Sequence, residues 1–339
     1  MKPLIAITMG DPGGIGPEII LKSLREVSLD RAIYMLVGCE EVFRYASDQL
    51  RIPFKPHMIP TLERSLLKED QVNFLDITHE AEALYENIFH QRPSRDEVFV
   101  VGQISKWNAA LAYCALKVAA YQGACDLVHG VVTAPINKTA IRLIDPKFSG
   151  HTEYLAKIAR VKEFAMMFVS DRLRVTLVTI HLALKKVPRA LKTEDIVTKI
   201  ELTDDFLKRR LKIKMPRLGV SALNPHGSEF GTEEEEIILP AVQLAQKQGI
   251  HIEGPLPGDQ IFHDAYEGRL DAVVAMYHDQ GLAPFKMISF REGVNVTLGL
   301  PYLRTSPDHG TAFDIAYRNQ AFSTAFLNST RLVEKVFTS

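Results

Sequence analysis

The sequence has only three cysteines, and their placement excludes two kinds of site. The number of cysteines is odd, and none of them has the close spacing of metal-binding pairs: they are Cys39, Cys114 and Cys125. Neither a disulfide framework nor a cysteine zinc site is therefore expected. We expect all three thiols to be buried.

The chain also lacks a strong net charge and a long apolar run. Its formal net charge of -1 at pH 7 gives no bulk attraction to nucleic acid or to anionic membranes, so local groups must hold any anion that binds. The first apolar run is interrupted by Asp11, Pro12 and Gly13, too early for a signal peptide, and no later run approaches a membrane span. We expect a cytoplasmic protein that binds neither nucleic acid nor membrane.

What is present is the pattern of a globular α/β protein. A length of 339 residues exceeds what one hydrophobic core usually occupies, so two domains are the default expectation. Short β-rich runs at residues 4–9, 32–38, 126–133 and 271–277 alternate with longer stretches of helical period. This alternation predicts an α/β fold with a largely parallel sheet.

Three local signals predict where helices begin. Ser105 suits the N-cap of a helix that stops at Gly123. Thr232 and Glu235 fit a capping box, which accounts for the neighbouring acidic run better than metal ligation does. The glycine-rich turn at residues 10–17 joins a strand to a helix and is expected to turn backbone N–H groups toward an anion. It does not match the dinucleotide-binding GxGxxG pattern, which disfavours a conventional Rossmann cofactor site.

Histidines follow three of the predicted strands. His181, His226 and His278 each stand at or just past the end of an apolar run. In open α/β sheets ligands bind at the carboxyl ends of the strands, and three neutral imidazoles suit a catalytic divalent metal with open coordination positions. Each histidine taken alone is equally consistent with a structural or surface residue. The repeated placement favours a shared metal site.

Two cations and a polar loop near the C-terminus suggest an anion site. Lys286 and Arg304 are able to grip a phosphate together, Arg304 by its planar fork and Lys286 as a point charge, although surface ion pairs remain an alternative. The segment at residues 293–316 also concentrates polar side chains among glycines and prolines. Loops of this composition often bind a ligand.

These segments closely resemble the 4-hydroxythreonine-4-phosphate dehydrogenases of vitamin B6 synthesis. The resemblance is carried by the strings GDPGGIGPEI, TAPINK, GHTEYLA, LNPHGSE with GTEEEE, GPLPGD, MYHDQGLAPFK and VNVTLGLPYLRTSPDHGTAFDIA. The first and last are also similar to GDGIGPE and HGSAPDIA of the isocitrate and isopropylmalate dehydrogenases. The resemblance implies two α/β/α domains that flank a cleft and a homodimer whose active site is shared between subunits. We place the first domain at residues 1–135 with 300–339, and the second, with much of the metal site and dimer contact, at 136–299.

The resemblance also assigns residues. The metal ligands of the family fall on His181, His226 and His278, and come from both subunits. Its substrate contacts fall on five further positions, namely His151, Thr152, Lys286, Asn295 and Arg304. The stretch that includes His309, Gly310 and Asp314 would border the adenosine half of NAD, although Phe313 replaces the proline of the wider group's motif.

The implied reaction is NAD- or NADP-dependent oxidation of 4-phosphooxy-L-threonine with zinc, magnesium or cobalt as the divalent metal. The product, 2-amino-3-oxo-4-phosphooxybutanoate, decarboxylates to 3-amino-2-oxopropyl phosphate in pyridoxal 5'-phosphate biosynthesis. Asp259 is a candidate proton acceptor or ligand-orienting carboxylate, although a loop carboxylate that only caps a turn fits equally. One alternative is a D-threonate or D-erythronate 4-phosphate dehydrogenase. More remote alternatives are a metal-dependent hydrolase or lyase of a phosphorylated metabolite and a non-catalytic metabolite-binding protein.

Overall fold

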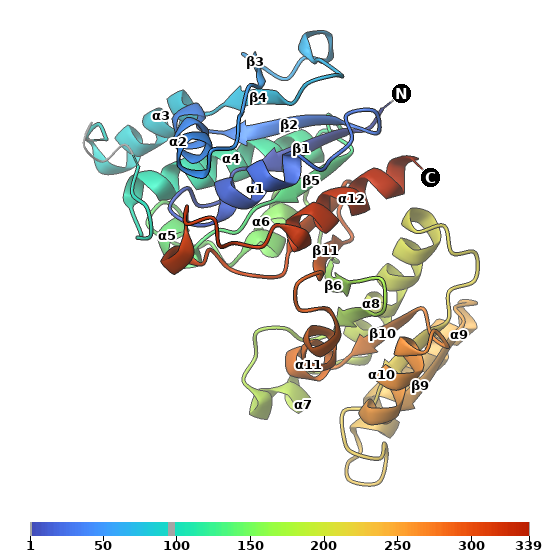
Figure 1. Cartoon of the computed structure of the whole chain (residues 1–339). Helices are drawn as coiled ribbons and strands as arrows, with labels where there is room; N and C mark the ends of the chain where they lie inside the picture. The colour runs from blue at the N-terminus through green and yellow to red at the C-terminus, as the bar shows by residue number, and fades with distance from the viewer. Residues whose placement is uncertain (1, 94–98, 339) are drawn as a thin grey trace. The chain divides into compact units, whose positions relative to one another are not determined.

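The computed structural model describes residues 2–93 and 99–338 and divides the chain into two compact units. The first unit consists of Met1–Val161 and Leu300–Ser339, and the second of Lys162–Gly299. Each unit is built from a β-sheet covered by helices (Figure 1). The predicted α/β class is therefore confirmed.

The sheet of the first unit is wholly parallel over its described strands. Its order is β3 (His57–Ile59), β4 (Asn73–Asp76), β2 (Ile33–Gly38), β1 (Leu4–Thr8), β5 (Gly130–Thr133) and β12 (Leu303–Pro307). The central strands β1 and β2 are buried along their whole length. Burial on both faces explains why they consist of continuous apolar runs instead of alternating ones.

Helices follow most strands of the first unit, as parallel pairing requires. They are α1 (Gly16–Leu24), α2 (Glu40–Leu50), α3 (Thr78–Phe89), α4 (Lys106–Ala124), α5 (Lys138–Ile141), α6 (His151–Ile158) and α12 (Thr324–Thr338), with 3-10 turns at Arg64–Leu66 and Phe313–Ile315. The predicted N-cap of α4 is confirmed, because the hydroxyl of Ser105 accepts from the backbone N–H groups of Trp107 and Asn108.

The C-terminal segment of the chain completes this first unit. Strand β12 pairs with β5, and α12 packs on both strands. Helix α12, red in Figure 1, also lies beside α1, which is blue. Gly130 leaves room for α12, because a Cβ at this position would overlap Cγ1 of Val333. The hydroxyl of Tyr34 on β2 donates to Glu334 of α12. Residues far apart in sequence thus form one core.

The sheet of the second unit mixes both strand directions. Its order is β11 (Val294–Leu298), β6 (Ala165–Val169), β7 (Arg174–Leu177), β10 (Ala272–Ala275), β8 (Leu218–Ser221) and β9 (Ile252–Leu256). The pairs β11–β6 and β6–β7 are antiparallel, whereas β7, β10, β8 and β9 run parallel. The prediction of a largely parallel sheet therefore holds, with β6 as the reversed strand.

Helices cover both faces of this second sheet. They are α7 (Val187–Ala190), α8 (Thr193–Asp205), α9 (Leu239–Lys247), α10 (Gly258–Tyr266) and α11 (His278–Ser289), with a 3-10 turn at Leu184–Lys186 and π-helical turns at Phe206–Arg210 and Glu234–Ile238. Val175 and Leu177 of β7 join Ile261 of α10 and Phe285 of α11 in one apolar cluster. Thr176, which points to the opposite face, accepts a hydrogen bond of 2.8 Å from Thr203 of α8.

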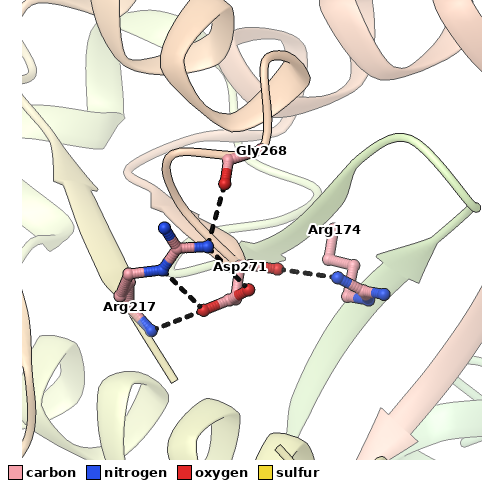
Figure 2. Close-up of polar contacts among 4 residues, drawn as sticks. All are labelled: Arg174, Arg217, Gly268 and Asp271. Atoms are coloured by element: carbon pink, nitrogen blue, oxygen red, sulfur yellow. Dashed lines mark hydrogen bonds and ion pairs between the residues drawn. The ribbon is translucent and has the colours of Figure 1, made fainter. Parts of the chain in front are cut away.

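A cluster of hydrogen bonds joins the amino ends of the parallel strands in the second unit. We call it the Asp271 clamp, and it consists of Arg174, Arg217, Gly268 and Asp271. The carboxylate of Asp271, which precedes β10, accepts from the backbone N–H of Arg217 at 2.8 Å and from its Nε at 3.2 Å. Arg217 also donates to the carbonyl of Gly268, and Arg174 donates to the carbonyl of Asp271 (Figure 2). The clamp therefore ties the starts of β7, β8 and β10 together.

Three details differ from the sequence-based expectations. The first unit extends to Val161 and not to residue 135, because α5 and α6 pack on α4, while the boundary at 299/300 is where we placed it. Cys39 and Cys114 are buried as expected, but Cys125 is exposed. Helical residues do begin at Glu233, and the N–H of Glu236 donates to the carbonyl of Thr232, but no side-chain capping bond forms there. The buried carboxylate of Glu234 instead accepts from Leu223 and Asn224.

Among the helices of residues 2–93 and 99–338, none has both the length and the apolar character that crossing a membrane requires.

Candidate functional site

Two of the three predicted metal-ligating histidines lie side by side in the second unit. His181 follows β7 and His278 follows β10, and these strands are parallel neighbours. Parallel neighbours end at the same edge of a sheet, so residues just past their carboxyl ends are brought together. The two imidazole ring centroids are 5.9 Å apart. This separation lets both rings face one small ion.

The ring of His278 is oriented by the next residue. Its Nδ1 lies 2.7 Å from Oδ1 of Asp279. An ionised carboxylate can only accept, so Nδ1 carries the proton and Nε2 of the neutral ring keeps its lone pair. Metal-ligating histidines usually donate their other ring N–H to a carboxylate, a backbone carbonyl or water, and such a contact fixes the tautomer. His278 is thus prepared to bind a cation through Nε2.

The structure does not bring His226 to the same place. His226 lies in the exposed loop that follows β8, beyond the strand end at Ser221, and has a left-handed backbone with φ of 57°. The loop is held by Glu234, which accepts from the backbone of Leu223 and Asn224 and from the Asn224 side-chain amide. Within the part of the chain that the structure describes, no three His, Cys, Asp or Glu side chains gather closely enough to hold a metal ion. One chain therefore offers two of the predicted ligands together and the third on a separate loop.

Three predicted substrate contacts lie in the first unit. His151 and Thr152 begin helix α6, and Arg304 lies on β12 with only 2% of its surface exposed. The buried Nε2 of His151 has no hydrogen-bond partner in the structure. Burial and the nearby cations Arg304 and Lys138 hold the pKa of His151 well below its ordinary value. The imidazole is therefore neutral near pH 7 and available to a ligand.

Arg304 is a buried cation with a fixed direction. Its Nη2 donates to the hydroxyl of Thr133, at the end of β5, across 2.7 Å. Burial lowers the pKa of its guanidinium to about 10, so the group remains charged at neutral pH. A buried charge is costly unless something compensates it. A buried guanidinium of fixed direction also suits a site that takes an anion.

The other two predicted substrate contacts lie in the second unit. Lys286 is on α11, where its ammonium lies 5.6 Å from the ring centroid of Phe290. Asn295 is on β11, and its buried Oδ1 has no hydrogen-bond partner in the structure. Since Lys286 and Arg304 belong to different units, their joint grip on one phosphate stays a prediction.

The glycine-rich turn after β1 does not present its amides to an anion, which corrects the sequence-based expectation. The N–H of Gly13 donates to the carboxylate of Asp11 at 2.9 Å, and that of Gly14 donates to the Asp11 carbonyl. The N–H of Ile15 donates to the carbonyl of Thr311. Asp11 is 1% exposed, and burial raises the pKa of its carboxyl from 3.8 to about 6. The turn supplies its own anion and is closed to an external one.

The same turn supports the segment predicted to border a cofactor. Besides the contact from Ile15 to Thr311, the hydroxyl of Tyr317 donates to the carbonyl of Pro12 at 2.6 Å. The structure therefore brings together the two strings that resemble the isocitrate and isopropylmalate dehydrogenases. His309 and Gly310 are exposed beside this contact, and Asp314 is exposed within the 3-10 turn Phe313–Ile315.

Asp259, the candidate proton acceptor, is exposed in the first turn of α10. A carboxylate there complements the positive end of the helix, which fits a structural role as well as a chemical one.

Sequence reasoning missed two carboxylates. Asp279 follows a predicted ligand directly, so adjacency to His278 was an available signal. Asp11 gave a weaker signal, because an aspartate before Pro–Gly–Gly usually indicates an exposed turn. Asp11 is buried in a turn that is contacted by Thr311 and Tyr317, which are distant in the sequence.

Comparison with known proteins supports one family over nearly the whole chain. Residues 32–333 match the family model described as "Pyridoxal phosphate biosynthetic protein PdxA". The chain is 41% identical to a 4-hydroxythreonine-4-phosphate dehydrogenase of Aquifex aeolicus, covering 98% of both chains. It is 40% identical to a D-threonate 4-phosphate dehydrogenase of Pectobacterium atrosepticum, covering 95% of both. A crystal structure of 4-hydroxythreonine-4-phosphate dehydrogenase from Klebsiella pneumoniae aligns with a TM-score of 0.84, at 36% identity and 99% coverage of both chains.

Proposed function

The chain belongs to the pyridoxal phosphate biosynthetic protein PdxA family and is a dehydrogenase, and from this we propose that it oxidises 4-phosphooxy-L-threonine with NAD or NADP. The product, 2-amino-3-oxo-4-phosphooxybutanoate, would lose CO2 to give 3-amino-2-oxopropyl phosphate. The observation that carries the proposal is the family match across residues 32–333.

The residues of the second unit fit a divalent metal only in part within one chain. His181 and His278 face each other, and Asp279 orients the ring of His278. A third imidazole would complete a catalytic set, and we propose that His226 of a second copy supplies it. Exposure of the His226 loop supports this arrangement, because a loop that serves a neighbouring copy must extend from its own unit. The protein would then act as a homodimer with a shared active site.

The reaction needs charge stabilisation at the oxygen of the substrate's secondary alcohol. Bound at these histidines, zinc, magnesium or cobalt would supply Lewis-acid stabilisation of that oxygen, and NAD or NADP would accept the hydride. The histidines' task is to present lone pairs in a fixed geometry. Asp279 contributes by holding the proton of His278 on Nδ1, away from the coordinating nitrogen.

The first unit supplies the groups that bind an anionic substrate. Arg304 offers a buried guanidinium, and neutral His151 can donate from Nε2. In the second unit, Lys286 adds a cation and Asn295 an amide. Fixing both ends of the substrate would hold its carbinol hydrogen toward the nicotinamide, which accelerates the reaction by orientation. His309, Gly310 and Asp314 would border the adenosine half of the cofactor, with Asp314 accepting from a ribose hydroxyl.

A second candidate function differs only in substrate. The 40% identity to the D-threonate 4-phosphate dehydrogenase of Pectobacterium atrosepticum favours the sugar-acid phosphate almost as strongly as the Aquifex relative favours the amino acid. The two substrates differ in an ammonium or a hydroxyl group at carbon 2. Both candidate functions are dehydrogenase activities. The hydrolase, lyase and non-catalytic alternatives are therefore left without support.

The deciding experiment compares NADH formation from 4-phosphooxy-L-threonine and D-threonate 4-phosphate by the purified, metal-loaded protein. A kcat/KM for the amino substrate at least tenfold above that for the hydroxy substrate is the expected result. Preference for the sugar-acid phosphate would transfer the proposal to the second candidate. Turnover of neither, with NAD or NADP, would contradict both.

A further inference from the structure

A lysine outside the predicted set reaches the start of helix α6. Asn137 caps the short helix α5 by accepting from the N–H of Ala140 at 3.0 Å, and Lys138 is the first residue of α5. The Nζ of Lys138 lies 3.3 Å from the position that a Cβ on Gly150 would occupy. Gly150 is the N-cap residue of α6 and makes no side-chain cap. The ammonium group is therefore placed at the helix N-terminus.

This end of α6 already favours negative charge. The first N–H groups of a helix have no partner within the helix, and the macrodipole makes this end positive. His151 and Thr152 are its first two residues, and the buried Nε2 of His151 has no hydrogen-bond partner in the structure. The orphaned ring nitrogen is an independent sign that a ligand atom belongs there.

Two cations act on the same imidazole. Lys138 and Arg304 both lower the pKa of His151, and the Nζ of Lys138 lies 3.3 Å from the Cβ position of the preceding residue, Gly150. Arg304 is buried and aimed by its bond to Thr133, whereas Lys138 is exposed. The cluster thus combines one fixed cation with one that is accessible from solvent.

The carboxylate beside this cluster does not neutralise it. Oε2 of Glu153 lies 2.8 Å from the position of a Cβ on Gly150. Among the described residues, however, no carboxylate oxygen lies within 4.0 Å of the Lys138 ammonium. With neutral His151, one carboxylate faces two cations and a positive helix end. The excess is positive, which suits an oxyanion.

We propose that Lys138 is a substrate-binding residue that holds an oxyanion of the substrate, its phosphate or its carboxylate, at the N-terminus of α6 together with His151, Thr152 and Arg304. The identity of the substrate rests on the proposed function, but the oxyanion site does not. Lys138 would meet the arriving anion from the solvent side, and Arg304 would contact it from the protein interior.

The test compares Lys138→Met with Lys157→Met, a control in the same helix α6 whose lysine is exposed. Charge-assisted hydrogen bonds are strong enough that losing one should raise the KM for 4-phosphooxy-L-threonine by about 10- to 100-fold. The kcat should change by less than about threefold, because the proposal gives Lys138 a role in holding the oxyanion and none at the carbinol carbon. Lys138→Arg should recover most of the loss, because it restores the charge.

A second measurement needs no turnover and so separates this proposal from the proposed function. Isothermal titration of the whole protein with inorganic phosphate, and separately with L-threonine, reports which oxyanion the cluster binds. Phosphate binding that weakens in Lys138→Met but not in Lys157→Met assigns the site to the phosphate end, and the same result with L-threonine assigns it to the carboxylate end. If neither ligand and no KM distinguishes Lys138→Met from Lys157→Met, the proposal is wrong, whatever reaction the protein catalyses.

Discussion

Arg304 on β12 donates from Nη2 to the hydroxyl of Thr133 at the end of β5, across 2.7 Å. The two strands are paired in parallel register, so this bond directs the guanidinium toward the carboxyl end of β5. The backbone there continues into α5, which carries Lys138. One hydrogen bond thus fixes the direction of a buried cation whose charge also lowers the pKa of His151 at the start of α6.

Replacing Arg304 should impair binding more than folding. Arg304→Met removes a buried charge and fills its space with an apolar chain, a change that often leaves stability intact. Without its buried partner the anionic substrate should bind more weakly by about 2 kcal/mol or more, roughly 30-fold in kcat/KM. Steady-state kinetics and a thermal melt measure the two effects. An unchanged kcat/KM would remove Arg304 from the site.

Arg304→Lys provides a second variant in case the methionine chain does not fold. Lysine keeps the charge but loses the planar fork, so activity between those of Arg304→Met and the native chain is expected.

Mixing two inactive variants should restore activity if the histidines are shared between copies. His226→Ala and His278→Ala each disrupt every site of their own homodimer. In a mixed dimer, one site receives His181 and His278 from one copy and His226 from the other, all intact. Random exchange should therefore recover about a quarter of the native activity. No recovery from a mixture shown to contain mixed dimers would place all three histidines in one chain's site.

Asp279 should tune metal affinity without coordinating the metal. Asp279→Asn removes the charged acceptor 2.7 Å from Nδ1 of His278, and the loss of such contacts weakens metal binding by about 10- to 100-fold. Cobalt titration followed by visible absorption measures the affinity. His263→Ala, which removes an exposed histidine of α10, should bind cobalt as tightly as the native chain. Equal affinity in Asp279→Asn would restrict Asp279 to a surface role.

Asp11 should make the fold less stable as pH rises. The folded chain holds the Asp11 proton more tightly than the unfolded chain, because the carboxyl pKa is raised by burial from 3.8 to about 6. Stability from this group is complete below pH 3.8 and is lost as pH rises through about 6. Asp11→Asn removes this dependence. As pH rises from below 3.8 to above about 6, the free energy of unfolding of the native chain should therefore fall relative to that of Asp11→Asn by on the order of 3 kcal/mol.

Urea denaturation at several pH values measures this difference. Asp30→Asn, which changes an exposed carboxylate of the same unit, should keep a nearly constant offset from the native chain. The same constant offset in Asp11→Asn would show that Asp11 does not titrate in the folded state as its burial implies.

The Asp271 clamp should matter for stability and not for chemistry. Asp271→Ala leaves the backbone N–H and the Nε of Arg217 without their acceptor, although Nη2 keeps its bond to the Gly268 carbonyl (Figure 2). An unfolding free energy lower by about 1–3 kcal/mol is expected. The clamp lies at the amino ends of the strands, whereas His181 and His278 follow their carboxyl ends, so kcat should be retained. A loss of kcat as large as that of stability would contradict this separation.

Sequence reasoning succeeded where strand order alone decides proximity. His181 and His278 both follow apolar strands, and adjacency of β7 and β10 is enough to bring them together. His226 also follows a strand, β8, which neighbours β10. Its loop continues well past the strand end and is fixed by the buried Glu234. The position of that loop depends on tertiary contacts, which no local sequence pattern predicts.

The same limit explains the errors. The capping box assigned to Thr232 and Glu235 does not form, and the carboxylate of this acidic run that is buried is Glu234, which accepts from the loop after β8. The glycine-rich turn was expected to bind an anion because its amides appeared unpartnered in the local sequence. Asp11 and Thr311 accept from them, and Thr311 is some three hundred residues away. Local propensity identified the helix starts, but not which groups compete for them.

Because β12 and α12 complete the first unit from the far end of the chain, the order of synthesis differs from the order in space. The ribosome finishes the continuous second unit, Lys162–Gly299, while the first still lacks its β12 strand. A nascent chain halted after Gly299 would present α6 and Lys138 without Arg304. The proposed oxyanion site is therefore complete only after translation has passed β12, and chaperones would meet the N-terminal half with one edge of its sheet unpaired.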